Sequence, residues 1–432
     1  MFAGHRPSNW SWSVAGVIVL QMATAAEIRP VLSEAANLSA TRPLAHNPEF
    51  DLLIACCADS PSHSHAARIR ELLSCPLDWK RMLHLVDHHR VVPQVYRALL
   101  VLSNLVPSEP LHALRLRYRD NARKALWFTT ELVRVVSHLE SAGIRALAYK
   151  GPILAQTLYG EVTERQFGDL DFLILPADVP KAKASLLEMG QTCGPELRRN
   201  QEPAYIGSGC GYVFHSAAGR NLLDLQWRIV PRFYSMDFDI PGFFARAREI
   251  NFGTQAMDSH PVRTLRSEDL MLVLCVHAAK HVWIQLSWLC DIAQLAKSPQ
   301  FDWDVIQDEA RRFGIERILG LSLFLAHNLL DAPLPSQIQK RLRADPSTAL
   351  LAGEIQRIIE HSTHYNTESI PYFRLMMRLR ERWQDQARFL WRLTVTPSVS
   401  EWSAVSLPKP LQPVYRLVRL SRLAKRLAFG IG

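Results

Sequence analysis

Two aspartates, Asp169 and Asp171, stand at the front of the apolar stretch FGDLDFLIL at residues 167–175. Side chains of a strand alternate between its two faces, so both carboxylates are predicted to point the same way. Such a pair supplies the oxygen ligands that Mg²⁺ prefers, commonly together with the phosphates of a substrate. Two acids in a strand can also cap an edge or face solvent, so the interpretation depends on their neighbours.

A third acid, Asp224, lies in the stretch LLDLQWRI. Residues 211–230 read as a β-hairpin that turns at SAAGRN, and its second strand is predicted to lie beside the acidic strand. Three acids around two metal ions suit the in-line transfer of a phosphoryl or nucleotidyl group. The alternative is that Asp224 pairs with a neighbour such as Arg228.

Three further residues are candidates to bind phosphate. Lys150 and Gly151 end a predicted strand and begin a predicted helix, where a glycine permits close backbone approach and the helix N-terminus offers amide donors. Arg165, in the loop before the acids, is a candidate second phosphate clamp. The alternative is an ordinary strand-end lysine and a solvated loop arginine.

The elements that must position these residues alternate in type. A strand at 144–150, a helix at 151–160, the acidic strand, a helix at 179–190 and the hairpin predict a small α/β or α+β core. Helical patterns flank it on both sides, including a long helix over 111–143 and a helical run over 267–299 with Ser267 as its predicted N-cap. The predicted regions are an extension or linker at 1–47, a helical region at 48–142, the core at 143–240, a helical domain at 241–395, and a proline-bearing segment with a basic tail helix at 396–432.

The stretch YKGPILAQTLYGEVTERQFGDLDFLIL resembles the uncharacterised nucleotidyltransferase family of the DNA polymerase β-like superfamily. The features that carry the resemblance are Lys150-Gly151, Leu158-Tyr159, Arg165 and Asp169-Leu170-Asp171. The similarity extends to the N-terminal helical stretch at 78–99, to LLDLQWRI, to HAAKHVWIQLSWLCDIAQL and to the C-terminal segment, over about residues 48–425.

This resemblance implies an α+β fold with a small mixed-sheet nucleotidyltransferase core between helical regions. It also implies that Asp169 and Asp171 bind Mg²⁺ (or Mn²⁺) and a nucleoside triphosphate such as ATP, with Asp224 as a third ligand that activates the acceptor. The sequence departs from the wider superfamily at the phosphate loop, where Lys150-Gly151-Pro152 replaces the usual Gly-Ser. Gln226 stands where a histidine is common.

Two other stretches have charge patterns that could contact a ligand. His277 and His281 are four residues apart, but position 278 is alanine and no third zinc ligand is evident, so Lys280 and His281 are instead taken as candidate nucleotide contacts. In the tail at 415–432, arginines recur near helical spacing. This tail could make weak contact with an acidic membrane surface or with RNA. The alternative is a helix that caps a domain and turns its basic face to solvent.

Composition narrows the class of protein. A hydrophobic content of 48% over 432 residues is enough for substantial cores, and the net charge of +9 favours an anionic partner. The seven scattered cysteines lack zinc or disulfide spacing and predict reduced, mostly buried thiols in the cytoplasm. The apolar residues 13–26 faintly resemble a secretory signal, but we favour a poorly ordered extension.

Three functions remain open at this point. The first is a Mg²⁺-dependent nucleotidyltransferase that acts on an unknown acceptor, such as a small molecule, a peptide or a sugar. The second is a catalytically silent relative that binds nucleotide and regulates a partner. The third is a kinase-like phosphotransferase that uses the same metal site.

Overall fold

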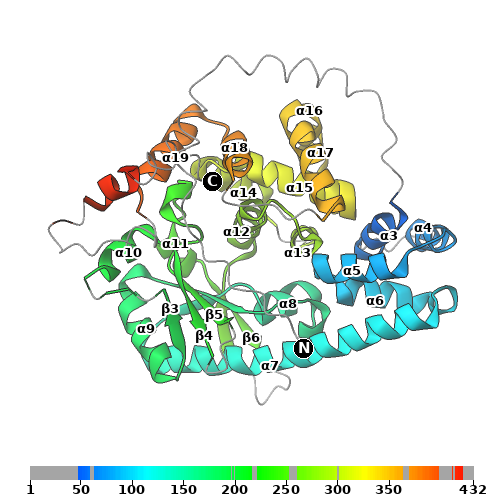
Figure 1. Cartoon of the computed structure of the whole chain (residues 1–432), viewed down its shortest axis with the longest axis horizontal. Helices are drawn as coiled ribbons and strands as arrows, with labels where there is room; N and C mark the ends of the chain where they lie inside the picture. The colour runs from blue at the N-terminus through cyan, green and yellow to red at the C-terminus, as the bar shows by residue number, and fades with distance from the viewer. Residues whose placement is uncertain are drawn as a thin grey trace.

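The computed structural model describes residues 47–58, 63–195, 197–198, 200–216, 221–252, 260–298, 301–362, 369–397, 411 and 414–421. The predicted extension at 1–47 lies outside these residues except for Asn47. A mixed α+β core stands between helical regions, as the sequence predicts (Figure 1).

The N-terminal helices are α3 (Pro48–Cys57), α4 (His63–Leu73), α5 (Trp79–His89), α6 (Val92–Val101), η3 (Ser103–Leu105) and α7 (Ser108–Ser141). Asn47 and Asp78 cap α3 and α5 with their side chains, as is usual for these residue types. The predicted long helix is therefore present as α7. Figure 1 shows it running beneath the sheet and on past α5 and α6.

The core follows in chain order as β1 (Ala146–Ala148), α8 (Pro152–Tyr159), η4 (Val162–Glu164), β2 (Leu170–Ile174), η5 (Pro176–Asp178), α9 (Val179–Glu188), β3 (Thr192–Gly194), α10 (Glu202–Ser208), β4 (Gly211–His215) and β5 (Asn221–Gln226). The strands form one sheet in the order β1-β2-β5-β4-β3. β2 and β5 are parallel, and the other neighbours are antiparallel. The predicted hairpin of β4 and β5 is confirmed, although its turn at 217–220 lies outside the described residues.

The two faces of the sheet pack differently. Leu170 and Phe172 of β2 and Leu223 and Leu225 of β5 are buried against α7 and α9. The alternate positions of both strands face the other way, and Leu173 on that face joins the core of the helical regions. The paired acids therefore lie on the face directed toward the helices that follow the core in sequence.

The C-terminal part contains η6 (Arg232–Tyr234), α11 (Ile240–Ala245), a two-stranded sheet of β6 (Arg248–Phe252) and β7 (His260–Thr264), and the helices α12 (Ser267–Lys280), α13 (Leu286–Leu295), α14 (Trp303–Phe313), α15 (Glu316–Leu330), α16 (Ser336–Ala344), α17 (Pro346–Glu360), α18 (Ile370–Arg378) and α19 (Trp383–Val395). A further helical segment spans 415–421. β3, β6 and β7 were not predicted, and β6 and β7 place a two-stranded sheet inside the region 241–395 that was predicted to be helical.

The predicted helical run over 267–299 is divided in the structure. α12 ends at Lys280, and Val282 and Trp283 adopt positive φ values of 57° and 50° before α13 begins at Leu286. Trp283 is fully buried and donates a hydrogen bond from its indole to Ser322 Oγ at 3.0 Å. A tertiary contact thus accompanies the break, and the apolar pattern alone predicted a continuous run. Ser267 is also the first helical residue, not the N-cap, which is Arg266.

Candidate functional site

The three predicted catalytic acids lie together at the carboxylate site, which we define as Asp169, Asp171 and Asp224. In the register of β2 and β5, Asp171 stands directly opposite Asp224, and Asp169 comes one residue before β2 begins. Asp171 is buried, while Asp169 and Asp224 are half-buried. The predicted juxtaposition of the acidic strand and the hairpin is therefore present.

Burial and mutual repulsion disfavour the charged forms of these acids. Burial raises the pKa of Asp169, and the negative charge of Asp171 adds to that rise. Burial likewise raises the pKa of Asp224 to about 7, with further contributions from Asp171 and Asp169. A carboxyl group that titrates near neutral pH is suited to accept and release a proton.

Lys150 is the immediate counter-charge of the carboxylate site. Its Nζ lies 2.7 Å from Asp171 Oδ1, and it is mostly buried. The amide of Gln226 donates to the same oxygen at 3.2 Å, and the hydroxyl of Tyr149 donates to Gln226 Oε1 at 2.6 Å. Lys150 therefore pairs with one of the three acids, and its predicted contact with a phosphate stays a prediction.

Gly151 connects β1 to α8 at a place where the chain has little room. Its φ is +64°, and an added Cβ would lie 2.9 Å from the backbone oxygen of Asp169. Any other residue would be both strained and in collision with the backbone that carries the first acid. The glycine was predicted for close approach to a phosphate, and the structure shows a close approach to the acidic strand itself.

Arg165 is held by a carboxylate and not directed to solvent. Its guanidinium makes a bidentate ion pair with Asp291 of α13, with nitrogen–oxygen distances from 2.8 to 3.0 Å, and both side chains are buried. The hydroxyl of Tyr159 donates to the same carboxylate at 3.0 Å. Arg165 therefore ties the loop before β2 to α13, and its predicted role as a phosphate clamp stays a prediction.

Lys280 and His281, at the end of α12, come to the same face of the sheet. Burial lowers the pKa of Lys280, and among nearby charges Lys150 lowers it further whereas Asp224 and Asp171 raise it. Lys280 is thus within electrostatic reach of the carboxylate site. The predicted nucleotide contact of these two residues stays a prediction.

An aromatic group flanks this part of the site. The rings of His277, His281 and Trp288 form a triangle with centroid distances of 4.9 to 5.3 Å. Burial, followed by the charge of Lys150 for His277 and of Lys280 for His281, lowers the pKa of both histidines well below 6.5. Both are neutral at pH 7, so they present flat, uncharged surfaces.

Sequence reasoning assigned no role to several residues that the fold brings to the site. Tyr149 directly precedes the predicted site residue Lys150. Gln226 lies two residues after Asp224 and so on the same face of its strand. The position of each in the sequence could therefore have indicated a place at the site. Arg90 comes from the N-terminal helices and had no comparable indicator.

The donor chemistry of the carboxylate site fits Mg²⁺, because Asp171 and Asp224 stand opposite each other on adjacent strands and Asp169 directly precedes one of these strands. Their side chains are not drawn into ligand geometry: among the described residues, no three His, Cys, Asp or Glu side chains form a group that could hold a metal ion. Asp171 is bonded to Lys150 instead.

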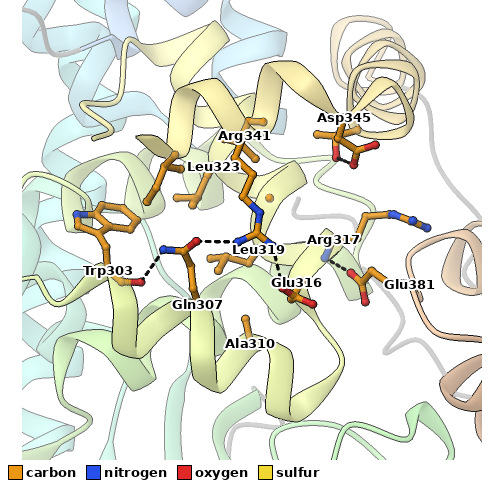
Figure 2. Close-up of a pocket in the computed structure, with 14 residues that line it drawn as sticks. Trp303, Gln307, Ala310, Glu316, Arg317, Leu319, Leu323, Arg341, Asp345 and Glu381 are labelled. Carbon is orange, nitrogen blue, oxygen red and sulfur yellow. Dashed lines mark hydrogen bonds and ion pairs between the residues drawn. The ribbon is translucent and has the colours of Figure 1, made fainter. Parts of the chain in front are cut away.

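A separate cavity of about 170 Å³ lies among α14, α15, α16 and α17 (Figure 2). Its polar lining is internally paired: Glu316 contacts Arg341 at 2.9 Å, Arg341 donates to Gln307 at 2.8 Å, and the backbone of Arg317 donates to Glu381. None of the candidate site residues is among those that line this cavity. It carries no grouping of catalytic type, and we place the candidate function at the carboxylate site.

The model of the family described as uncharacterised nucleotidyltransferase matches residues 76–331, more than half of the chain. The matched region contains the whole mixed sheet, the three acids and the helices α12 and α13. The chain belongs to this family. No curated protein and no solved structure matches it.

All seven cysteines are free thiols, as predicted, and Cys56, Cys57, Cys275 and Cys290 are fully buried. No helix among the described residues is both long enough and apolar enough to cross a membrane.

Proposed function

We propose that the chain transfers a nucleoside monophosphate from a nucleoside triphosphate, with ATP the expected donor, to a hydroxyl or phosphate of an acceptor. The observation that carries this proposal is the register of two parallel strands that sets Asp171 opposite Asp224, with Asp169 beside them and Lys150 bonded to Asp171. Membership of the nucleotidyltransferase family supports it.

The proposed roles follow from the position of each group. Asp224, whose pKa is raised to about 7, accepts the proton of the acceptor hydroxyl. The acceptor oxygen forms a bond to the α-phosphorus, the bond from that phosphorus to the bridging oxygen breaks, and pyrophosphate leaves. Lys150 and Lys280 supply positive charge on the face where the phosphates must lie.

Asp169, Asp171 and Asp224 would hold the Mg²⁺ or Mn²⁺ that we propose as cofactor. Such an ion neutralises charge that develops on the phosphates and orients the attacking and leaving oxygens. Because Asp171 already accepts bonds from Lys150 and Gln226, these two residues would orient the carboxylate that the ion meets.

Two observations favour a second candidate, a catalytically silent nucleotide-binding relative. The Lys150–Asp171 pair occupies a carboxylate that the reaction needs, and Pro152 at the start of α8 has no amide hydrogen to offer a phosphate. This relative would bind nucleotide without releasing pyrophosphate.

The test uses purified protein with Mg²⁺, an acceptor pool from cell extract, and each nucleoside triphosphate labelled on the α-phosphate or on the γ-phosphate. We expect transfer of α-label with release of pyrophosphate, and a loss of at least a hundredfold in Asp169→Asn and Asp171→Asn because each removes a charge at the reacting phosphates. Asp308→Asn, which alters an exposed acid of α14, is the matched control and should retain full activity.

Each other outcome selects an alternative. Transfer of γ-label would indicate a kinase-like phosphotransferase. Binding of triphosphate that Asp171→Asn abolishes, without transfer of either label, would favour the silent relative. Equal activity in the wild type and both variants would contradict any role of the carboxylate site in transfer.

A further inference from the structure

Arg90 ends helix α5 in a conformation that its residue type does not favour. Its φ and ψ are 54° and 49°, in the left-handed region, and its backbone N–H donates to carbonyl oxygens of Val86 and Asp87. Glycine is the usual residue at such a helix end, because a Cβ is disfavoured there. The backbone alone makes the hydrogen bonds of this helix end. We therefore look for a role of the arginine side chain elsewhere.

The chain on either side of Arg90 is bound to two different parts of the site. The ring of buried His89 accepts a hydrogen bond from the backbone N–H of Leu286, at the start of α13, at 3.4 Å. Two residues after Arg90, the N–H of Val92 donates to Gln166 Oε1 at 2.8 Å. Arg90 therefore stands between the turn that follows His281 and the loop that leads to Asp169.

A third hydrogen bond also fixes the position of residue 90 in the fold. The side-chain amide of Gln94 donates to the carbonyl of Glu164 at 3.0 Å, so the start of α6 is joined to the same loop at two points. The position of residue 90 relative to the carboxylate site is consequently set by hydrogen bonds on both flanks.

The side chain of Arg90 is exposed and makes no hydrogen bond or ion pair with any residue in the described part of the chain. Its charge nevertheless acts on the site: it partly opposes the rise that burial causes in the pKa of Asp169, and it adds to the fall that burial causes in the pKa of His281. Two other cations near the site already have acidic partners: Lys150 is bonded to Asp171, and Arg165 to Asp291.

We propose that Arg90 binds the outer phosphates, β and γ, of the nucleoside triphosphate at the entrance to the carboxylate site. This inference rests on the proposed function. The acids are buried or half-buried, so a reacting α-phosphate must reach inward to them and the remaining phosphates extend outward, toward an exposed residue at the rim. A planar guanidinium matches two phosphate oxygens at once and suits this task better than an ammonium.

The experiment measures displacement of a fluorescent ATP analogue by inorganic tripolyphosphate and by AMP, in the presence of Mg²⁺, for the full chain. We expect Arg90→Ala to weaken tripolyphosphate binding about tenfold while AMP binding changes less than twofold, since AMP lacks the outer phosphates. Arg90→Lys should recover part of the loss. Arg343→Ala, the same charge change at an exposed position of α16, is the matched control and should bind as the wild type does.

Arg90→Gly separates a role in binding from a role in the cap. Glycine accepts the left-handed conformation without strain, so this variant should melt at the same temperature as the wild type or higher, yet bind tripolyphosphate as weakly as Arg90→Ala.

Wild-type affinity for tripolyphosphate in both Arg90→Ala and Arg90→Gly would overturn the inference. If those variants bind normally while the wild type transfers α-label and Asp171→Asn does not, the inference fails alone and the proposed function stands. If the wild type binds neither ATP nor tripolyphosphate, both fail together.

Discussion

At the residue scale, the central feature is a set of carboxylates that the fold keeps close together although burial and mutual repulsion disfavour their charged forms. Asp171 is buried with a lysine and an amide on one of its oxygens, and Asp224 faces it from the neighbouring strand. Like charges on a shared, partly dehydrated surface raise each other's pKa. A bound cation would relieve this repulsion, which is why we propose that the arrangement is a binding site.

The pKa of Asp224 leads to a prediction for stability against pH. Because its folded pKa of about 7 exceeds the ordinary value of 3.8, the folded state retains a proton that the unfolded state releases. The stability that this proton supplies is fully present below about pH 4 and is lost as the pH rises through 7. Asp224→Asn should therefore unfold with more difficulty than the wild type at pH 8, by about 1–3 kcal/mol, which is less than the full shift implies because the group is only half-buried.

Urea unfolding at pH 4.5 and pH 8, without added divalent metal, measures this difference. The advantage of Asp224→Asn should shrink toward zero at the lower pH. An equal advantage at both values would show that Asp224 is not a group with a raised pKa. Asp308→Asn serves as the control for loss of an exposed acid.

At the element scale, the loop between α8 and β2 is connected to helices that are distant in sequence. Gln166 and Glu164 bond to α6 and its start, and Arg165 bonds to α13. Glu164 and Gln166 thus contact the N-terminal helices, whereas Arg165 between them contacts a C-terminal helix. One short loop therefore connects the two helical regions. The positions of Asp169 and Arg90 both depend on these links.

The Arg165–Asp291 pair offers a test of this connection. Asp291→Ala would leave a buried guanidinium without its counter-charge, and it would also remove the acceptor of Tyr159. We expect a loss of about 3–5 kcal/mol in the free energy of unfolding. Chemical denaturation of Asp291→Leu, Arg165→Met and the double variant forms a thermodynamic cycle.

The double variant should be more stable than Asp291→Leu alone, because it removes both buried charges together. Additive losses in the cycle would mean that the two side chains do not stabilise each other. Arg263→Met, at an exposed arginine that pairs with Glu249, provides a control whose cost should stay within about 0.5 kcal/mol.

At the scale of the whole molecule, the two flanking helical regions are not independent bodies. Buried residues from α3, α5 and α6 form one continuous hydrophobic core with residues from α12 through α19. A second core joins the sheet to α7 and α9. The carboxylate site lies on the sheet face directed toward the first core, so both helical regions border it.

The tail also packs onto this body. Tyr415 is buried and accepts a hydrogen bond from Gln201 at 3.1 Å, and buried Arg419 donates to the carbonyl of Leu393 in α19 at 2.6 and 3.1 Å. Arg416, by contrast, is exposed. Contact of the tail with a membrane surface or RNA stays a prediction, and Arg419 could take part only if the helix detached. Arg422 and Arg426 lie outside the described residues.

Arg419→Ala tests whether the tail stabilises the fold. It should lower the free energy of unfolding by about 1–3 kcal/mol, because it leaves the Leu393 carbonyl without its charged donor. Arg416→Ala, on the exposed side of the same helix, should change stability by less than about 0.5 kcal/mol. Calorimetric melting of both variants decides the matter, and equal melting temperatures would contradict a stabilising role for the tail.

The sequence by itself determined the fold class, the acidic strand, the glycine at the start of α8 and the hairpin that carries Asp224. These features depend on local rules: period-two alternation, the restricted backbone of a turn, and the pattern shared with the family. The partner of Arg165, the break between α12 and α13, the ion pair of Lys150 and the place of Arg90 were decided only by the tertiary structure. Each depends on which distant segment arrives beside it, and no pattern within a single stretch of chain contains that information.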